Sequence, residues 1–320
     1  MVTGDYKLIA SRKSLEARIR AQKPSQFRQI DGRQTTIVTR KDYLLKEASK
    51  IKGIEIHVKL HSSPISKFRK EHPPAWMMTL VGFGDLTKHE GIQNLWQQSV
   101  DQTALRFSHQ LSGSGFKLSE IDVYELGCGC GCGRLASELA GLTRSYTGSD
   151  TNIDFINYNS KAYPDGSFKH LDFHNEMYNP NGKLGSIKLE EKPSSFDIFY
   201  GASVFTHFRS GHVAESIAEA GSLLRPGGLL IQSIYLKRSA TNGRDTVPRG
   251  GGLPISHELD AYSWSQDKES NVFVVYDEGF ILESADQNGF ECYKIARGPW
   301  GGLKSNIDSD WQDWILLRKK

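Results

Sequence analysis

The chain has 320 residues, of which 38% are hydrophobic and 24% charged, and its mean hydropathy is −0.46. This composition is typical of a folded globular protein and excludes a disordered chain. No apolar run approaches the roughly 20 residues of a membrane-spanning helix, and the first residues lack the apolar stretch of a secretory signal. Four cysteines are too few for a disulfide scaffold, so we expect a reduced, cytoplasmic protein with no membrane partner.

The net charge of +3 is distributed unevenly along the chain. Residues 1–72 hold 17 Lys and Arg against 7 Asp and Glu, whereas residues 73–320 hold 23 against 30. A basic segment of this kind is either a solvated surface that attracts the acidic body, or a patch for nucleic acid or a phosphorylated small molecule. It lacks the interleaved aromatic residues and Arg/Gly clusters of nucleic-acid binders, so nucleic acid is not favoured as a partner.

Few elements are predicted before residue 120. A basic helix is expected over residues 13–21 and a strand over 54–61, and Pro73-Pro74 ends this region. Residues 91–112 are predicted to form a helix because their apolar side chains fall on one face.

From about residue 120, predicted strands alternate with predicted helices. The strands are expected at 121–126, 145–150, 168–172, 196–203 and 228–236, and the helices at 133–142 and 212–224, the second of which stops at the Pro-Gly-Gly of 226–228. This alternation implies parallel strands joined by crossover helices, which is a doubly wound, Rossmann-like α/β sheet. A helix at 277–288 and strands at 290–297 and 311–319 then complete a mostly parallel sheet of seven strands.

The polar, glycine-rich stretch at 237–270 interrupts this alternation after the fifth strand. A long loop in a compact domain is usually functional or disordered. We therefore expect an insertion there that lies on the substrate side.

The sequence ELGCGCGCGR at 125–134 joins the first of these strands to its helix. Its three cysteines, with Cys292 as a fourth ligand, offer soft-metal chemistry, but zinc sites pair their cysteines as Cys-x2–4-Cys. A strand, a glycine-rich turn and a helix instead present backbone N–H groups to a nucleotide or an amino acid. The dinucleotide fingerprint G-x-G-x-x-G has its last two glycines three apart, whereas these glycines step by two. We therefore predict no metal site and no dinucleotide site here.

This loop resembles the first motif of class I S-adenosylmethionine-dependent methyltransferases, in which an acid stands two residues before glycines that are spaced by two. Glu125, Gly127, Gly129 and Gly131 match that pattern. A second register, in which Gly129, Gly131 and Gly133 precede Arg134, matches the end of the motif better but puts glycine at the position of the acid. We prefer the first register, and which of Gly131 and Gly133 closes the loop stays open.

Further segments stand in the order of the same family. Asp150 ends the second strand 19 residues after Gly131, and the LDF of 171–173 ends the third. FDIFYGASVFTHF at 196–208 resembles the fourth motif, and LLRPGGLLIQSIY at 223–235 resembles the segment that leads into the fifth strand. The SVFTH and LLRPGG words resemble those of bacterial small-molecule methyltransferases.

The resemblance covers about residues 73–320 and leaves residues 1–72 unexplained. It implies a methyltransferase domain over 76–320, with residues 1–75 as a basic N-terminal extension or cap and 237–270 as the insertion.

The resemblance implies S-adenosyl-L-methionine as the cofactor. The residues expected to bind it are Glu125, Gly127, Cys128, Gly129, Gly131, Arg134, Asp150, Thr151, Asp172, Phe173, Ala202 and Ser203. The glycines let the backbone approach the methionyl and ribose parts closely, and Glu125 would attract the ammonium group directly or through water. Asp150 would accept bonds from the ribose hydroxyls, although it could also be a plain N-cap of the next helix. Asp172 would accept from the adenine amino group, with a slip of one residue left open.

His207 is the first candidate for a catalytic base, because it follows the fourth strand and a histidine can take a hydroxyl proton near neutral pH. The alternative is a structural histidine that caps the following helix. His257, in the insertion, is the second candidate.

The expected function is methyl transfer to a small molecule, with a hydroxyl of a sugar, glycan or secondary metabolite as the acceptor. The fourth motif lacks the Asn/Asp-Pro-Pro-aromatic word of many base-amine methyltransferases, which disfavours methylation of nucleic-acid bases. Two alternatives stay open: an RNA or protein methyltransferase guided by the basic segment, and a cofactor-binding protein without turnover. The oligomeric state is not indicated.

Overall fold

The computed structural model describes residues 73–74, 77–78, 81, 103–104, 106–131, 142–175, 178–237, 255, 257–265, 273–301 and 311–320, and the backbone of four strands nearer the N-terminus. These four are β1 (Asp5–Ile9), β2 (Phe27–Ile30), β3 (Arg33–Thr36) and β4 (Glu55–Lys59), and they form two antiparallel pairs, β1 with β4 and β2 with β3. β4 confirms the strand predicted at 54–61. Several predicted elements lie outside the described residues: the helices at 13–21 and 133–142, much of the helix at 91–112 and much of the stretch 237–270.

The main domain alternates strands and helices in chain order. Its elements are η1 (Leu118–Glu120), β5 (Asp122–Leu126), β6 (Ser145–Asp150), α7 (Ile153–Ala162), β7 (Ser167–His170), β8 (Phe196–Gly201), η2 (Phe205–His207), α8 (Ser210–Leu223), β9 (Leu224–Leu236), β10 (His257–Asp260), β11 (Ser263–Ser265), β12 (Val275–Tyr276), α9 (Glu278–Gln287), β13 (Phe290–Ala296), η3 (Pro299–Gly301) and β14 (Asp313–Lys319). Residues 106–111 are also helical.

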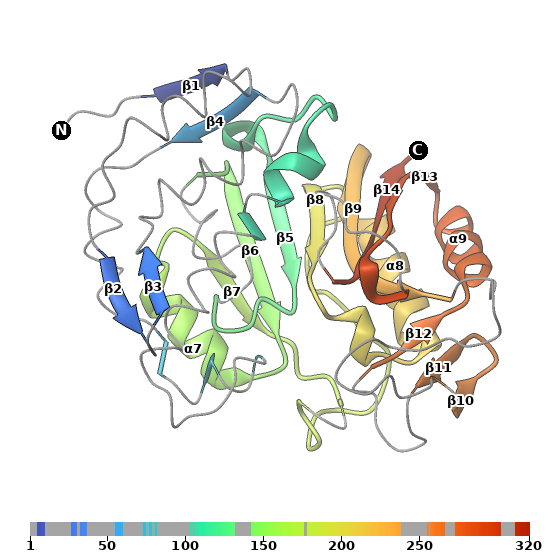
Figure 1. Cartoon of the computed structure of the whole chain (residues 1–320). Helices are drawn as coiled ribbons and strands as arrows, with labels where there is room; N and C mark the ends of the chain where they lie inside the picture. The colour runs from blue at the N-terminus through green and yellow to red at the C-terminus, as the bar shows by residue number, and fades with distance from the viewer. Residues whose placement is uncertain are drawn as a thin grey trace.

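The predicted seven-stranded, mostly parallel sheet is confirmed. Its strands follow the order β7-β6-β5-β8-β9-β14-β13, which Figure 1 shows from left to right. The first five are parallel, and β14 lies antiparallel between β9 and β13. β12 pairs with the carboxyl end of β9 and brings β11 and β10 with it, so the described residues form a sheet of ten strands.

Both faces of the sheet are buried, as in other parallel sheets that helices cover on both sides. Side chains alternate along a strand, so neighbours point to opposite faces. Tyr124 of β5 packs in the core that contains Val213 and Ile217 of α8, whereas its neighbour Val123 packs in the core that contains Phe107. The sheet is therefore covered by α8 and α9 on one face and by the helix at 106–111 on the other.

Two local differences from the sequence prediction have clear causes. The helix α7, which was expected after Asp150 without stated bounds, begins where the Asn152 side chain accepts from the N–H groups of Asp154 and Phe155. β9 was expected from residue 228, but it begins at Leu224, directly after α8. A register shift in its pairing with β8 and a positive φ of 81° at Gly227 let the Pro-Gly-Gly segment stay within the strand.

Four charged side chains join the amino ends of the central strands. Asp122 of β5 accepts from Arg144, which precedes β6, at 2.9 Å, and from Arg225 of β9 at 2.8 Å. Asp197 of β8 contacts the same two guanidinium groups at 3.0 and 2.9 Å and accepts the Asp122 N–H at 2.8 Å. We call these four residues the ion cluster; they fix the relative positions of β5, β6, β8 and β9.

Among the described residues, none of the helices combines the length and the apolar character that crossing a bilayer requires. The division at residue 75, the role of 237–270 and a cytoplasmic location stay predictions.

The ion cluster predicts an acid-sensitive contribution to stability. The Arg144 hydrogen bonds, acting against partial burial and helped by Ser145 and Arg225, lower the pKa of Asp122 from 3.8 to about 2. A carboxylate with a lowered pKa stabilises the fold above its unfolded pKa, and this contribution is lost as the pH falls toward 2. Asp122→Asn should therefore lower the free energy of unfolding at pH 7 by roughly 2 kcal/mol, and by less at pH 3.

Urea denaturation at both pH values measures this difference. Asp286→Asn is the control, since Asp286 forms an exposed pair with Lys320 and none of the cluster residues. An Asp122→Asn deficit that stays constant between pH 7 and pH 3 would contradict the role of the cluster.

Candidate functional site

The glycine loop follows β5 in a left-handed conformation. Gly127, Gly129 and Gly131 have φ angles of 69°, 55° and 79°, which residues with a Cβ adopt at a cost. A Cβ on Gly127 would lie 2.5 Å from Cγ2 of Val204, and one on Gly131 would lie 2.7 Å from Oη of Tyr163. These are the three glycines that the first register assigns to the cofactor loop, and two of them have no room for a side chain.

The loop is fastened to the two elements that follow it in the chain. The Cys128 N–H donates to the Ser149 carbonyl at 2.9 Å, and the Gly129 N–H donates to Asp150 Oδ2 at 2.8 Å. Nδ2 of Asn159, a fully buried residue of α7, donates to the Gly129 carbonyl at 2.7 Å. The ends of β5 and β6 and the middle of α7 therefore share one hydrogen-bonded unit.

Asp150 stands at the carboxyl end of β6, beside the loop. Its Oδ1 accepts the Asn152 N–H at 2.9 Å, while its Oδ2 accepts from Gly129. The N-cap alternative for Asp150 is wrong, since Asn152 caps α7. The two carboxylate oxygens of the half-buried Asp150 therefore join the glycine loop to the turn between β6 and α7.

Glu125 is fully buried beneath the loop and accepts from the Tyr146 hydroxyl. Burial, and after it the charge of Glu125, raises the pKa of Tyr146 far above its usual range, so the phenol stays a donor. The Glu125 carboxyl group has no exposed surface, and its partner on β6 is the Tyr146 hydroxyl.

The cysteines of the loop behave as small apolar side chains. Cys128 and Cys130 are fully buried, and Cys130 packs with Met77, Met78 and Phe155. In the described part of the chain, no group of three or more His, Cys, Asp or Glu side chains is arranged to hold a metal ion. Cys132, Gly133 and Arg134 lie outside the described residues.

The remaining cofactor candidates lie around the end of β7. Asp172 is exposed and pairs with Lys183 at 3.3 Å; although desolvation acts to raise it, the hydrogen bond and charge of Lys183 lower the pKa of Asp172. The ring of Phe173 is buried against His212 of α8, with centroids 4.8 Å apart. The Thr151 carbonyl lies 3.1 Å from Nε2 of His170. Because its ring is buried, Phe173 can contact a ligand through its backbone and not through its side chain.

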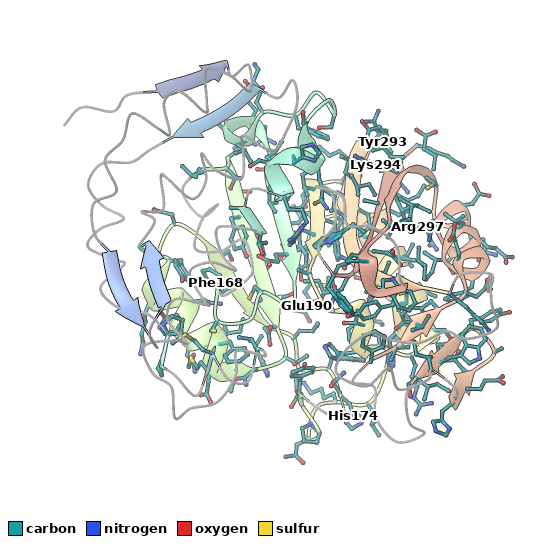
Figure 2. The ribbon with its side chains drawn as sticks, viewed as in Figure 1. Phe168, His174, Glu190, Tyr293, Lys294 and Arg297 are labelled. Atoms are coloured by element: carbon teal, nitrogen blue, oxygen red, sulfur yellow. The ribbon has the colours of Figure 1, made fainter. Side chains whose placement is uncertain are left out.

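A cavity of about 510 Å³ lies between β7 and the segment of residues 183–191. It extends from Ser149 at the end of β6 to Asp172. Glu190 borders the cavity. Figure 2 labels Glu190 and His174, which both belong to the connection between β7 and β8. His174 lies at the end of the molecule toward which the β5 arrow points in Figure 1. Asp172 thus stands on the rim of a space at the carboxyl edge of the sheet.

The turn after β8 contains Ala202 and Ser203. Ala202 is buried, and Ser203 has a φ of 55°, which is unusual for a residue with a side chain. The next residue, Val204, is the one that touches Gly127. The end of β8 therefore packs directly on the glycine loop.

His207 ends the short helix η2 and is paired with a tyrosine. Its Nε2 lies 3.3 Å from the hydroxyl of Tyr178, and the two rings meet edge to face at 5.2 Å. Asn175 accepts the Tyr178 N–H at 2.9 Å, while its Nδ2 lies 3.5 Å from the His207 carbonyl. The capping alternative for His207 is wrong, because the N-cap residue of α8 is Arg209 and no side chain of the cap binds the helix.

His257 begins β10, opposite Ser265 of β11. β10 lies beside the start of α8, where Asp260 Oδ2 accepts the Ser210 N–H at 3.2 Å and Arg209 donates to the Leu259 carbonyl at 3.3 Å. His207 thus ends the short helix that precedes α8, and His257 begins a strand that contacts the start of α8.

Several residues of the site were not predicted. Asn159 and Tyr178 reach the loop and His207 through contacts that a sequence does not display. An asparagine on the buried face of α7 was the available signal, because buried polar side chains are nearly always hydrogen-bonded.

The contact at Gly127 predicts a specific cost of substitution. Gly127→Ala introduces both a left-handed alanine and a clash with the stiff, β-branched Val204, so the free energy of unfolding should fall by about 2–4 kcal/mol. Gly227→Ala is the matched control, because Gly227 has a φ of 81° and nothing within 4 Å of the added Cβ. Urea denaturation compares the two, and equal losses would show that Val204 does not confine the loop.

The comparison with known families gives a match in the middle of the chain. Residues 126–232 match a family model described as a methyltransferase domain. This range begins at the glycine loop and ends in β9, so it contains β6, β7 and β8.

Two methyltransferases are among the solved structures to which this chain is similar. An S-adenosylmethionine-dependent methyltransferase from Mesorhizobium loti is 18% identical, with a TM-score of 0.47, and the match covers 67% of this chain and 98% of that one. The magnesium protoporphyrin IX methyltransferase of Synechocystis PCC 6803, with bound SAH, is 17% identical, with a TM-score of 0.46, over 77% and 93% of the two chains.

The family match covers the glycine loop, β8 and the turn after β8, whereas all of β5 except Leu126 lies before it. The glycine loop, with its left-handed backbone and the carboxylate of Asp150 beside it, fits a ligand that brings hydroxyl groups to a strand end. Residues 126–232 therefore carry a methyltransferase domain, as the motifs predicted, and such a domain takes S-adenosyl-L-methionine as its cofactor.

Proposed function

We propose that this methyltransferase acts on a hydroxyl group of a small molecule, such as a sugar, a glycan or a secondary metabolite. The observation that supports this most is the packing of Val204 on Gly127, which brings the end of β8 to the glycine loop. The His207 N–H donates to the Val204 carbonyl at 3.0 Å, so the histidine stands one turn from the contact with the loop.

In this proposal the cofactor lies along the loop. The glycines allow close approach of the backbone, and Asp150 accepts from hydroxyl groups of the ribose. Glu125 contributes a negative charge below the loop, where the low dielectric of the interior strengthens its attraction for a cation. Asp172 accepts from the adenine at the rim of the cavity. The bound cofactor supplies a methyl group from its sulfonium centre.

His207 is proposed to take the proton that the acceptor hydroxyl loses. A neutral imidazole is suited to this near neutral pH, and a positioned base contributes about 100- to 10,000-fold. Nε2 of His207 lies 3.3 Å from the Tyr178 hydroxyl, so an acceptor hydroxyl would have to displace Tyr178 in order to give its proton to that nitrogen. Most of the acceleration comes from holding the acceptor and the methyl group in line, so removal of the base should leave residual turnover.

The insertion at 237–270 is proposed to line the acceptor side. Its described strands β10 and β11 extend the sheet beyond the carboxyl end of β9, and ligands of open α/β sheets bind at that edge. Hydrogen bonds join β10 to Arg209 and Ser210 at the start of α8. The insertion therefore contacts a segment that directly follows His207 in the sequence.

The role of Asp150 is tested by binding alone. Asp150→Asn keeps the size of the side chain but loses the charge, so the dissociation constant for S-adenosylhomocysteine should rise about 10- to 100-fold. Isothermal titration calorimetry measures it. Asp154→Asn, in the exposed first turn of α7, is the matched control and should bind as wild type does. Unchanged affinity in Asp150→Asn would remove this carboxylate from the cofactor site.

The role of His207 is tested by transfer of a labelled methyl group to a panel of glycosides, phenols, polyols and amines. Wild type should methylate hydroxyl compounds, and His207→Ala should lose about 100-fold or more in kcat with its affinity for S-adenosylhomocysteine unchanged. His174→Ala is the control, because His174 is an imidazole of the β7–β8 connection whose Nδ1 lies 3.1 Å from the Pro180 carbonyl. Transfer only to amines would contradict the hydroxyl acceptor, and tight cofactor binding with no product in any arm would favour a protein without turnover.

A further inference from the structure

The turn after β8 holds a backbone conformation that needs support. Ser203 has a φ of 55°, a region that residues with a side chain adopt only when their surroundings impose it. Val204 follows directly and packs on Gly127. The conformation of Ser203 therefore decides where Val204 lies against the glycine loop.

Two side chains, one on β9 and one just before β14, fix Ser203. Its N–H donates to Ser233 Oγ of β9 at 2.6 Å, and its Oγ accepts from Gln312 Nε2 at 2.8 Å. The same Nε2 lies 3.3 Å from the hydroxyl of Tyr235. A glutamine amide has two N–H donors, so both donors of Gln312 are directed at this turn and at β9. A span of 109 residues separates Gln312 from Ser203 in the chain.

Gln312 is itself held in place by its neighbour Asp313. The buried Asp313 carboxylate accepts from the Gly298 N–H at 2.8 Å, from Trp300 Nε1 at 2.6 Å and from the Leu236 N–H at 3.1 Å. A Cβ on Gly298 would lie only 2.3 Å from the Gln312 carbonyl oxygen, so the two backbones are in close contact. The start of β14 is thus a fixed point from which the Gln312 side chain reaches Ser203.

We propose that Gln312 is a positioning residue for the cofactor site, which holds Ser203 in its left-handed conformation and so keeps Val204 against the glycine loop. This inference rests on the proposed function, because it takes the loop to be the cofactor site. It makes the start of the antiparallel strand β14 part of the machinery that the parallel strands β5 and β8 form.

The first test is binding of S-adenosylhomocysteine by isothermal titration calorimetry. Gln312→Ala removes one hydrogen bond to Ser203, so the dissociation constant should rise about three- to ten-fold. Gln312→Glu keeps the length of the side chain but has no N–H donors, and it should lose as much. Gln287→Ala is the matched control, since Gln287 is on α9 and bonds only the exposed Glu283, at 3.3 Å.

A double-mutant cycle separates positioning from general stability. Ser203→Gly removes both the hydroxyl and the conformational cost, so in that background Gln312→Ala should leave the dissociation constant unchanged. Thermal unfolding without ligand accompanies each measurement. A lower Tm with unchanged affinity, or the same loss of affinity in both backgrounds, would overturn the inference.

The failure of this inference differs from the failure of the proposed function. If wild type does not bind S-adenosylhomocysteine, the assignment of the loop as the cofactor site is wrong. If wild type and Gln312→Ala bind it equally well, only the role of Gln312 is wrong.

Discussion

The geometry of the site depends on the ion cluster at the opposite end of the sheet. Its four charges belong to or adjoin β5, β6, β8 and β9, and they tie the amino ends of these strands together. Because side chains alternate, a slip of one residue between two strands would exchange their buried faces. With the register fixed at the amino ends, the strands end in line, and the glycine loop, Asp150 and Ser203 meet at the carboxyl edge.

The glycine loop is shaped by protein contacts on three sides. β6 binds its backbone through Ser149 and Asp150, α7 through Asn159, and Val204 fills the space that a side chain at Gly127 would need. A loop that is already ordered spends little binding free energy on ordering when a ligand arrives. The two described cysteines of the loop, Cys128 and Cys130, are fully buried and serve as small packing residues between the glycines.

The sequence predicted the fold because the local signals agreed with one another. Strand and helix periods alternated, and the glycines at 127, 129 and 131 stand where the backbone is left-handed. Contacts between distant segments had no such signal: the bonds of Asn159, Tyr178 and Gln312 exist only after the chain has folded. The start of β9 was misplaced for a related reason, since pairing with β8 outweighs the local tendency of Pro-Gly-Gly to form a turn.

The position of β14 in the sheet has a consequence for synthesis on the ribosome. β14 lies between β9 and β13, yet it follows every other described strand in the chain. Until residues 313–319 emerge, β9 presents an open edge at the place of β14, and such an edge can pair with other chains. The nascent protein can therefore assemble its parallel strands early, but it remains prone to aggregation until this late strand inserts.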